Sequence, residues 1–257
     1  RMTDRSDILP KKNGWRRLSY TTRCGFVDWG HALPGGAEEL IGQIRSEMGR
    51  APGLNQMDIT LSGRPAFVVV YGQSMGSGAV SMSLVRHWIV RSNLSDTQRE
   101  RVALAIFMSA SHDFEVMQGS FPFSLKTADS SYSAEDLVSN LIGFYAALRS
   151  KEQKDMRALC GEVSVEESLR IWDANLPNGL GGIKNKTTKP VLFPTEEGNG
   201  DISFPPFLET VSPEPPGILW VKPLGSRFID GYLVNERVPL DFDSDGKMRI
   251  QPKVFAR

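Results

Sequence analysis

Apolar residues recur at helical spacing in several parts of the chain. In Ala37–Met48, Leu40, Ile41 and Ile44 fall on one face, and Gly49 follows as a stop signal. Three other segments begin with a capping box, in which a serine precedes an amide or acidic residue by three positions. These boxes predict helices from Ser95 to about Gln118, over Glu135–Leu148, and from Ser164 to about Ala174. The spacing of Leu84, His87 and Trp88 predicts a further helix over Val80–Val90.

Alternating and β-branched segments predict strands. Leu18–Val27 alternates weakly and is expected to form one strand. Met57–Leu61 and Ala66–Tyr71 flank a Ser-Gly-Arg-Pro turn, which predicts a β-hairpin, and a Gly/Ser loop is expected over Gly72–Gly78.

The composition of the chain changes after Gly179: ten of the 16 prolines lie between Lys189 and the end. We therefore expect a linker or N-terminal arm over residues 1–17, a mainly helical body over 18–178, and a Pro-rich, β-containing C-terminal part over 179–257. The predicted fold class is α+β, with the hairpin beside a cleft in the helical body.

Composition narrows the class of protein without naming a function. With 30 basic and 30 acidic residues the chain is formally neutral, which argues against a nucleic-acid partner bound through bulk charge. No apolar run approaches the roughly 18 residues that cross a bilayer, and no signal peptide is visible at Arg1, so the segment is typical of an excised domain. Cys24 and Cys160 lack metal-ligand spacing, and two core thiols are favoured over a disulfide.

One stretch carries a pattern suited to glycoside hydrolysis. Glu47 ends a predicted helix, and the hairpin that follows carries Asp58 and Thr60 on one face of its first strand. Glycoside hydrolysis needs a carboxylic acid to protonate the leaving oxygen and a second polar group across the sugar ring. A carboxyl shielded by apolar neighbours can keep its proton near neutral pH.

This order of elements resembles the lysozyme superfamily, in which a Gly-and-Gln turn, here Gly72 and Gln73, follows the hairpin. The resemblance implies a lysozyme-like body that cleaves peptidoglycan glycan strands without a cofactor. It makes Glu47 the general acid and gives Asp58 or Thr60 the second role. Glu38, near the start of the same helix, is another candidate carboxylate for that role. On a straight helix Glu38 lies about 180° from Glu47, so a shared cleft requires a bent helix. Further candidates for catalytic support or substrate binding are Glu115, Asp28, His31, Gln73, Trp29 and Tyr71.

Two blocks, Thr22–His31 and Ser133–Asn140, are similar to those of an uncharacterised bacterial family of secreted or lipoprotein-like proteins. Leu33 and Pro34 stand where that family has Arg-Asp. More broadly, the chain resembles the C-terminal lytic domain of a type VI secretion effector. That resemblance implies an antibacterial toxin that is secreted, acts on peptidoglycan in the periplasm of a target cell, and has a cognate immunity protein.

Other interpretations of the same residues stay open. Asp28 and His31 are three residues apart, as are His112 and Glu115 on a predicted helix face, and such groups could serve a metal-dependent cell-wall amidase or peptidase. No His-Glu-x-x-His motif is present. A third alternative is a non-enzymatic module that binds glycan or protein. In the simplest interpretation, Glu135 and Asp136 only stabilise a helix N-terminus, and Glu38 and Glu47 lie on a solvated helix face.

Overall fold

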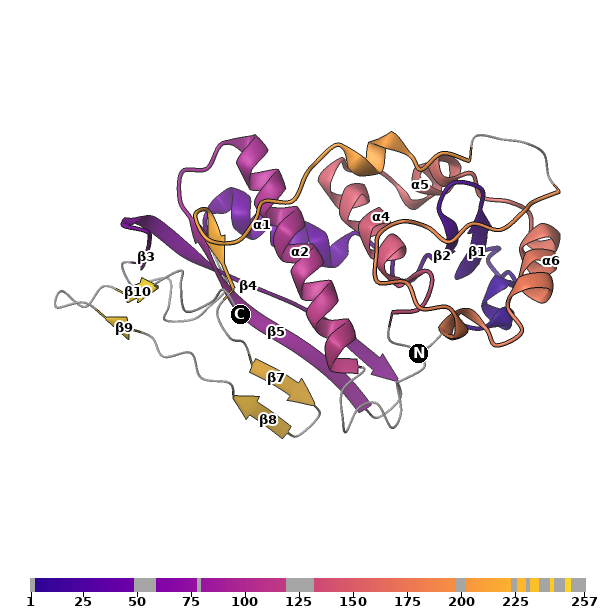
Figure 1. Ribbon diagram of the computed structural model, residues 1–257, viewed down its shortest axis with the longest axis horizontal. Helices are drawn as coiled ribbons and strands as arrows, with labels where there is room; N and C mark the ends of the chain where they lie inside the picture. Colours follow the sequence, from indigo (N-terminus) through magenta and orange to yellow (C-terminus); the bar gives the residue numbers. More distant parts are fainter. Residues whose placement is uncertain are drawn as a thin grey trace. The chain divides into compact units, whose positions relative to one another are not determined.

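The computed structural model describes residues 3–48, 59–77, 80–118, 132–196 and 202–222, together with four short strands between residues 226 and 250 (Figure 1). The chain divides into two compact units, neither of which is continuous in sequence. Unit 1 comprises residues 1–35 and 115–210, and unit 2 comprises residues 36–114 and 211–257. This division follows spatial contacts, whereas the expected division into arm, body and C-terminal part followed composition.

In its described residues, unit 1 combines a small hairpin with the helices α4 (Asp136–Leu148), α5 (Gln153–Cys160) and α6 (Val165–Asn175). The segment expected to be one strand is two, β1 (Leu18–Thr21) and β2 (Gly25–Asp28), which pair in antiparallel fashion around a tight turn. The short 3-10 turns are η1 (Arg5–Ile8), η3 (Leu180–Gly182) and η4 (Pro206–Glu209). The α4 and α6 helices confirm the sequence prediction within two residues, whereas α5 was not predicted.

Aromatic packing holds the hairpin of unit 1 in place. The Phe26 ring stands edge-on to Tyr20 and Trp172, with ring centroids 5.2 and 5.6 Å apart. Each such buried side chain contributes about 1.5–3 kcal/mol of hydrophobic stabilisation. The Tyr20 hydroxyl donates to the carbonyl of Phe193 and accepts its N–H, so a segment of the Pro-rich region is fastened over the hairpin. Gly25 allows this approach, because a Cβ there would lie 2.4 Å from the Val191 carbonyl oxygen.

Unit 2 is built on a long antiparallel ribbon (Figure 1). Its sheet has the order β8-β7-β5-β4-β3-β10-β9, with β6 also paired to β5. The strands are β3 (Ile59–Leu61), β4 (Arg64–Ser77), β5 (Val80–Arg91), β6 (Trp220–Val221), β7 (Ser226–Ile229), β8 (Tyr232–Asn235), β9 (Asp241–Phe242) and β10 (Met248–Ile250). The predicted hairpin is confirmed as β3 and the start of β4, and the expected β content of the C-terminal part is confirmed as well.

Two sequence predictions in unit 2 are wrong. The segment expected to be a helix over Val80–Val90 is strand β5, in which Leu84, Arg86, Trp88 and Val90 are buried with a period of two. The segment expected to be a Gly/Ser loop is the end of β4 as far as Ser77. Gly72 lies within that strand, where a Cβ would meet the backbone of Leu84 at 1.8 Å, so its role is close strand approach rather than a turn.

Helices α1 (Gly35–Ser46) and α2 (Asp96–Gln118) confirm two predictions within two residues at each end. The Ser95 box is complete, since Ser95 N–H donates to Gln98 Oε1 and the Ser95 hydroxyl accepts Gln98 N–H. The buried Gln43 side chain of α1 donates to the Val70 carbonyl and accepts the Val70 N–H, both at 2.9 Å. Val70 lies past Ala66, the last residue of β4 that pairs with β3, so Gln43 takes the place of a strand partner there. The α+β class is therefore confirmed, while the lysozyme-like arrangement is not. None of the described helices is long and apolar enough to span a bilayer.

Candidate functional site

Among the described residues, no polar contact joins Glu47 to Glu38 or Thr60, the groups expected to act with it on a glycan. Glu47 follows α1 in left-handed backbone conformation, and its Oε1 accepts the Asn93 N–H at 2.9 Å and faces Arg99 Nη2 at 3.2 Å. These contacts fasten the end of α1 to the start of α2, which is a structural role. Glu38 is exposed near the start of α1, and Thr60 pairs with Pro65 in the hairpin. Asp58 lies outside the described residues.

Three residues expected to bind substrate make other contacts in the structure. Trp29 is fully buried in unit 1, with its indole N–H on the Ser19 hydroxyl, so it cannot stack on a sugar. Tyr71 packs against Phe107 in the core of unit 2, where burial raises the pKa of its hydroxyl. The Gln73 amide donates to Ser111 at 2.6 Å.

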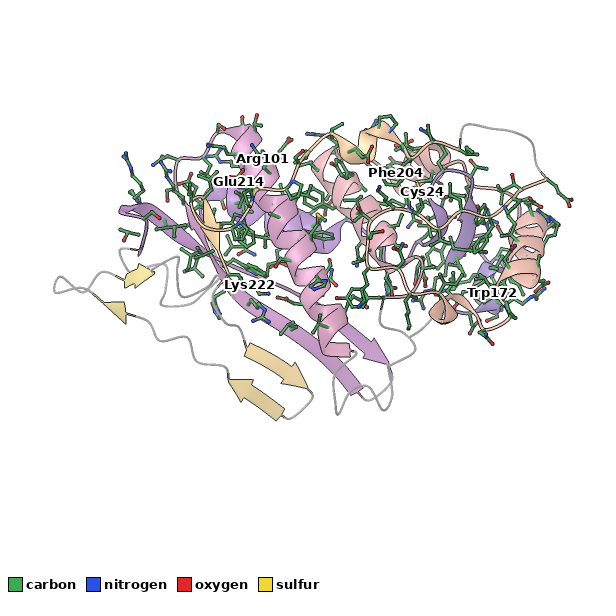
Figure 2. All side chains as sticks on the ribbon, in the orientation of Figure 1. Cys24, Arg101, Trp172, Phe204, Glu214 and Lys222 are labelled. Atoms are coloured by element: carbon green, nitrogen blue, oxygen red, sulfur yellow. The ribbon has the colours of Figure 1, made fainter. Side chains whose placement is uncertain are left out.

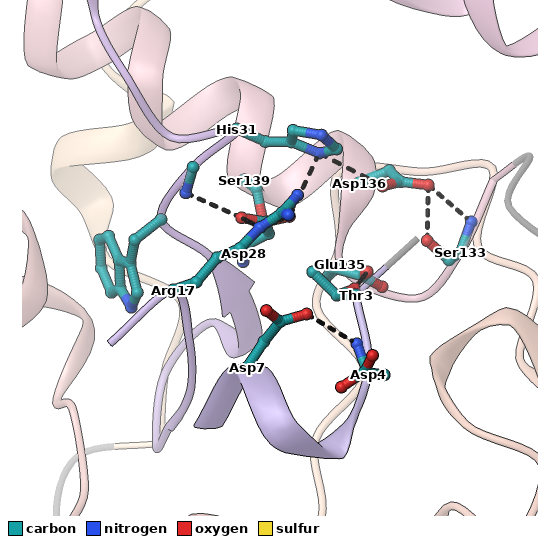
Figure 3. Close-up of polar contacts among 12 residues, drawn as sticks. Thr3, Asp4, Asp7, Arg17, Asp28, His31, Ser133, Glu135, Asp136 and Ser139 are labelled. Carbon is teal, nitrogen blue, oxygen red and sulfur yellow. Dashed lines mark hydrogen bonds and ion pairs between the residues drawn. The ribbon is translucent and has the colours of Figure 1, made fainter. Parts of the chain in front are cut away.

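A different group of titratable side chains converges in unit 1. The carboxylates of Asp28, Glu115, Glu135 and Asp136 are buried around the imidazole of His31. We call these five residues the carboxylate–histidine cluster. Figure 3 shows Asp28, His31, Glu135 and Asp136 of this cluster. Asp28 ends β2, His31 follows in the next turn, and Asp136 opens α4. The two family-like sequence blocks therefore meet here, with Asp28 and His31 from one and Glu135 and Asp136 from the other.

Asp28 is anchored from several directions. Its carboxylate faces the Arg17 guanidinium, with Nη2 2.9 Å from Oδ2, and accepts the Gly30 N–H at 2.8 Å. Its own backbone N–H donates to the Ser139 hydroxyl of α4 at 3.0 Å. Because the side chain is completely buried, Arg17 supplies the positive charge that its burial requires. The sequence assigns Arg17 to the N-terminal arm, and its neighbours along the chain do not indicate this role.

His31 is the most exposed member of the cluster, with 44% of its side chain accessible. Its Nδ1 lies 3.6 Å from Asp136 Oδ1 and 3.8 Å from Asp28 Oδ2. Desolvation alone would lower the pKa of His31, but its polar contact with Asp136 and the charges of Asp28, Asp136 and Glu135 raise it to about 9. The imidazole is therefore protonated at neutral pH and is held from its Nδ1 side.

Glu115 is a buried carboxyl that keeps its proton. Burial, and then the negative charge of Asp136, raises the pKa of Glu115 to about 8. The Tyr132 N–H donates to Glu115 Oε2 at 2.6 Å and opposes this shift, but does not overcome it. A carboxyl with this pKa can deliver a proton at neutral pH, as general acid catalysis requires.

Glu135 is the second acid with a raised pKa, brought to about 7 by burial and by the charge of Asp136. Its Oε1 accepts the Thr3 hydroxyl at 2.5 Å, whereas its buried Oε2 has no partner among the described residues. Asp136 is held on its other side by Ser133, whose N–H and hydroxyl donate to Oδ2 at 2.9 and 2.6 Å. The sequence interpretation, in which Glu135 and Asp136 only stabilise a helix N-terminus, is therefore incomplete, because both acids are buried within a larger group of charged side chains.

The cluster does not match the expected metal alternative. Within the described part of the chain, no group of three or more His, Cys, Asp or Glu side chains is arranged to hold a metal ion. His112, the fourth ligand of that hypothesis, is exposed on α2. Comparison with protein-family models, curated proteins and solved structures found no match to this chain.

We expect the stability of the protein to fall as pH rises from 5 to 9. Glu115 has a folded pKa of about 8 against an ordinary 4.5, so between these values the folded chain binds more protons than the unfolded chain. His31 acts in the same direction, because its contribution is complete below pH 6.5 and lost as pH rises through about 9. One pKa unit is worth about 1.4 kcal/mol, and 1 kcal/mol moves Tm by about 2–4 °C at this length, so calorimetry should show a fall of about 5 °C or more.

A Glu115→Gln variant provides the test of this cause. It removes the titrating proton but keeps an acceptor for Tyr132, so the decline of Tm with pH should become shallower. Glu38→Gln, at an exposed carboxylate on α1, should leave the decline as it is in the wild type. A wild-type Tm that stays level or rises over this pH range would contradict the assignment.

Proposed function

We propose that this chain is a hydrolase that cleaves the glycan strands of peptidoglycan, and that the carboxylate–histidine cluster is its acid–base site. The observation that carries the proposal is the raised pKa of buried Glu115 beside a second carboxylate, Asp136. Glycoside hydrolysis uses this combination of a protonated and an ionised carboxyl group. The substrate class rests on the resemblance to lysozymes and to type VI effector domains.

Each member of the cluster has a role in this proposal. Glu115 gives its proton to the leaving glycosidic oxygen, and Asp136 activates the water or stabilises the positive charge that develops on the sugar. His31, which is partly exposed and positively charged, binds the sugar and holds Asp136 on the Oδ1 side. Arg17 and Asp28 fix the turn that carries His31. The proton donor thus moves from Glu47 to Glu115.

The biological setting belongs to the same proposal. An effector of this kind is exported to the periplasm of a competing bacterium, where peptidoglycan is accessible, and its producer keeps a cognate immunity protein. No cofactor enters the mechanism, because the proton transfers use side chains of the chain itself.

Digestion of purified peptidoglycan by the wild-type protein tests the reaction class. We expect turbidity to fall and new reducing sugar ends to accumulate, without new free amines, at the same rate in the presence of EDTA. Reducing-end analysis and mass spectrometry of the fragments measure this directly. Release of amines without reducing ends, abolished by EDTA, would instead identify a metal-dependent amidase or peptidase, and intact peptidoglycan would favour a binding module.

A further inference from the structure

Two buried thiols face each other in unit 1, away from any role in the proposed reaction. Cys24 lies in the turn between β1 and β2 (Figure 2), and Cys160 is the last residue of α5. Both side chains are buried, which confirms the expectation of core thiols. Their Sγ atoms are 2.8 Å apart, although 136 positions separate the residues in sequence.

This separation leaves little movement for a covalent bond. A disulfide joins its sulfur atoms at about 2.05 Å, so the two Sγ atoms need to approach by less than about 1 Å. We expect rotation about the two Cα–Cβ bonds to supply this displacement.

The backbone on both sides holds the cysteines in register. Thr22 N–H donates to the Gly161 carbonyl at 2.9 Å, and Arg23 N–H donates to the Cys160 carbonyl at 3.1 Å. The Arg23 guanidinium also donates to the Leu159 carbonyl at 3.2 Å. The turn after β1 and the end of α5 are therefore joined around the sulfur pair, so the backbone holds the two cysteines side by side.

We propose that Cys24 and Cys160 form an intramolecular disulfide when the chain folds in the presence of a thiol–disulfide oxidant, such as oxidised glutathione or a disulfide oxidoreductase. One cysteine thiolate attacks a sulfur of the oxidant's disulfide and displaces one thiolate from it. The second cysteine then attacks the mixed disulfide at the protein's sulfur and displaces the other. The two protein thiols lose two electrons and two protons, and the oxidant's disulfide becomes two thiols.

The bond forms during folding rather than afterwards. In the folded chain the contact with Cys24, followed by burial, raises the pKa of the Cys160 thiol, so the reactive thiolate is scarce. Burial also keeps an external oxidant from the sulfur atoms. An oxidant present during refolding meets both thiols before the core closes over them.

The cross-link closes a loop of well over a hundred residues. A loop of that length removes much of the conformational entropy of the unfolded chain, and we expect Tm to rise by roughly 10 °C relative to the reduced protein. The cross-link stabilises the hairpin that ends in Asp28. The inference does not rest on the proposed glycan hydrolysis, and its test does not measure activity.

The test is oxidative refolding of the full chain in glutathione redox buffer. Alkylation in denaturant followed by intact-mass measurement should find a monomer with no alkylated cysteine and a mass two hydrogen atoms below that of the reduced chain. Its Tm should be roughly 10 °C above that of the same sample with reductant. A Cys24→Ala/Cys160→Ala double variant should have the Tm of the reduced wild type and no response to reductant.

Two alkylated thiols per chain after oxidative refolding would overturn the proposal, as would a disulfide-linked dimer on a non-reducing gel. An unchanged Tm on reduction of a cross-linked monomer would overturn the stabilising role. If the double variant fails to fold, the mass measurement on the wild type still decides whether the bond forms.

Discussion

A His31→Gln variant is expected to cleave peptidoglycan about 10²–10⁴-fold more slowly than the wild type, the range for loss of one positioned acid–base group. The substitution keeps a polar side chain at an exposed position but removes the positive charge between Asp136 and Asp28. Initial rates of reducing-end release, measured at equal concentrations of folded protein, give the result. Asp136→Asn should cause a loss of activity of similar size, because it removes the carboxylate. It keeps an oxygen acceptor for Ser133, so the local fold should be preserved.

Glu47→Gln is the matched control for this experiment. Glu47 was the proton donor expected from the sequence, but its carboxylate is occupied by Asn93 and Arg99 at the end of α1. Under the proposal this variant cleaves peptidoglycan at the wild-type rate. If it abolishes cleavage while His31→Gln and Asp136→Asn remain active, the reaction belongs to the hairpin site and the cluster is structural. Circular dichroism of each variant separates lost chemistry from lost folding.

The second large effect is expected on stability, from Asp113→Ala in unit 2. Asp113 is largely shielded from solvent on α2, with 11% of its side chain exposed, and it lies between two cations: Arg86 Nε of β5 at 2.9 Å and Lys222 Nζ at 2.5 Å. Arg86 is itself buried, so removal of Asp113 leaves its charge without compensation. Loss of one partner from a buried ion pair costs about 3–5 kcal/mol, and chemical denaturation should show a loss of that size.

A double substitution shows whether the loss of stability comes from the buried, unpaired charge of Arg86 or from the loss of a favourable Asp113–Arg86 ion pair. Replacing Asp113 by Leu and Arg86 by Met removes both charges and keeps apolar volume, so the double variant should be more stable than Asp113→Ala. Asp173→Ala serves as an exposed comparison, because Asp173 pairs with Arg5 where both side chains are about half exposed. It should change stability far less than Asp113→Ala. Equal losses for the two single variants would show that Arg86 remains solvated.

Local patterns in the sequence predicted some elements of the fold well. The Ser95 and Ser164 boxes were placed correctly because helix capping depends on residues three positions apart. The hairpin over β3 and the start of β4 was predicted from a tight turn between β-branched segments. In each case neighbouring residues supply the hydrogen bonds, so the information is local.

Strand β5 shows where such patterns mislead. Leu84 and Trp88 suit a helix by spacing, yet the same residues also fit a period of two with Arg86 and Val90. Pairing with β4 along twelve residues settles the choice, because it satisfies the backbone of both strands. The buried charge of Arg86 is possible only because α2 brings Asp113 to it.

Only part of the candidate site could be predicted from the sequence. Asp28, His31 and Glu115 were named as candidates, but as separate pairs along the chain. Arg17 was set apart as a piece of an arm, and Glu135 and Asp136 were assigned to a helix N-terminus. Nothing in linear spacing places residues 17, 28, 115 and 136 together.

The α+β class, most helix positions, one hairpin and two blocks rich in polar residues follow from patterns along the chain. Those features depend on propensity, capping and turn chemistry, which act over a few residues. The three-dimensional fold is needed to show that the two blocks meet, that Trp29 and Tyr71 are buried, and that Glu115 keeps its proton. Burial and the distance between charges determine a pKa, and both depend on residues far apart in the chain.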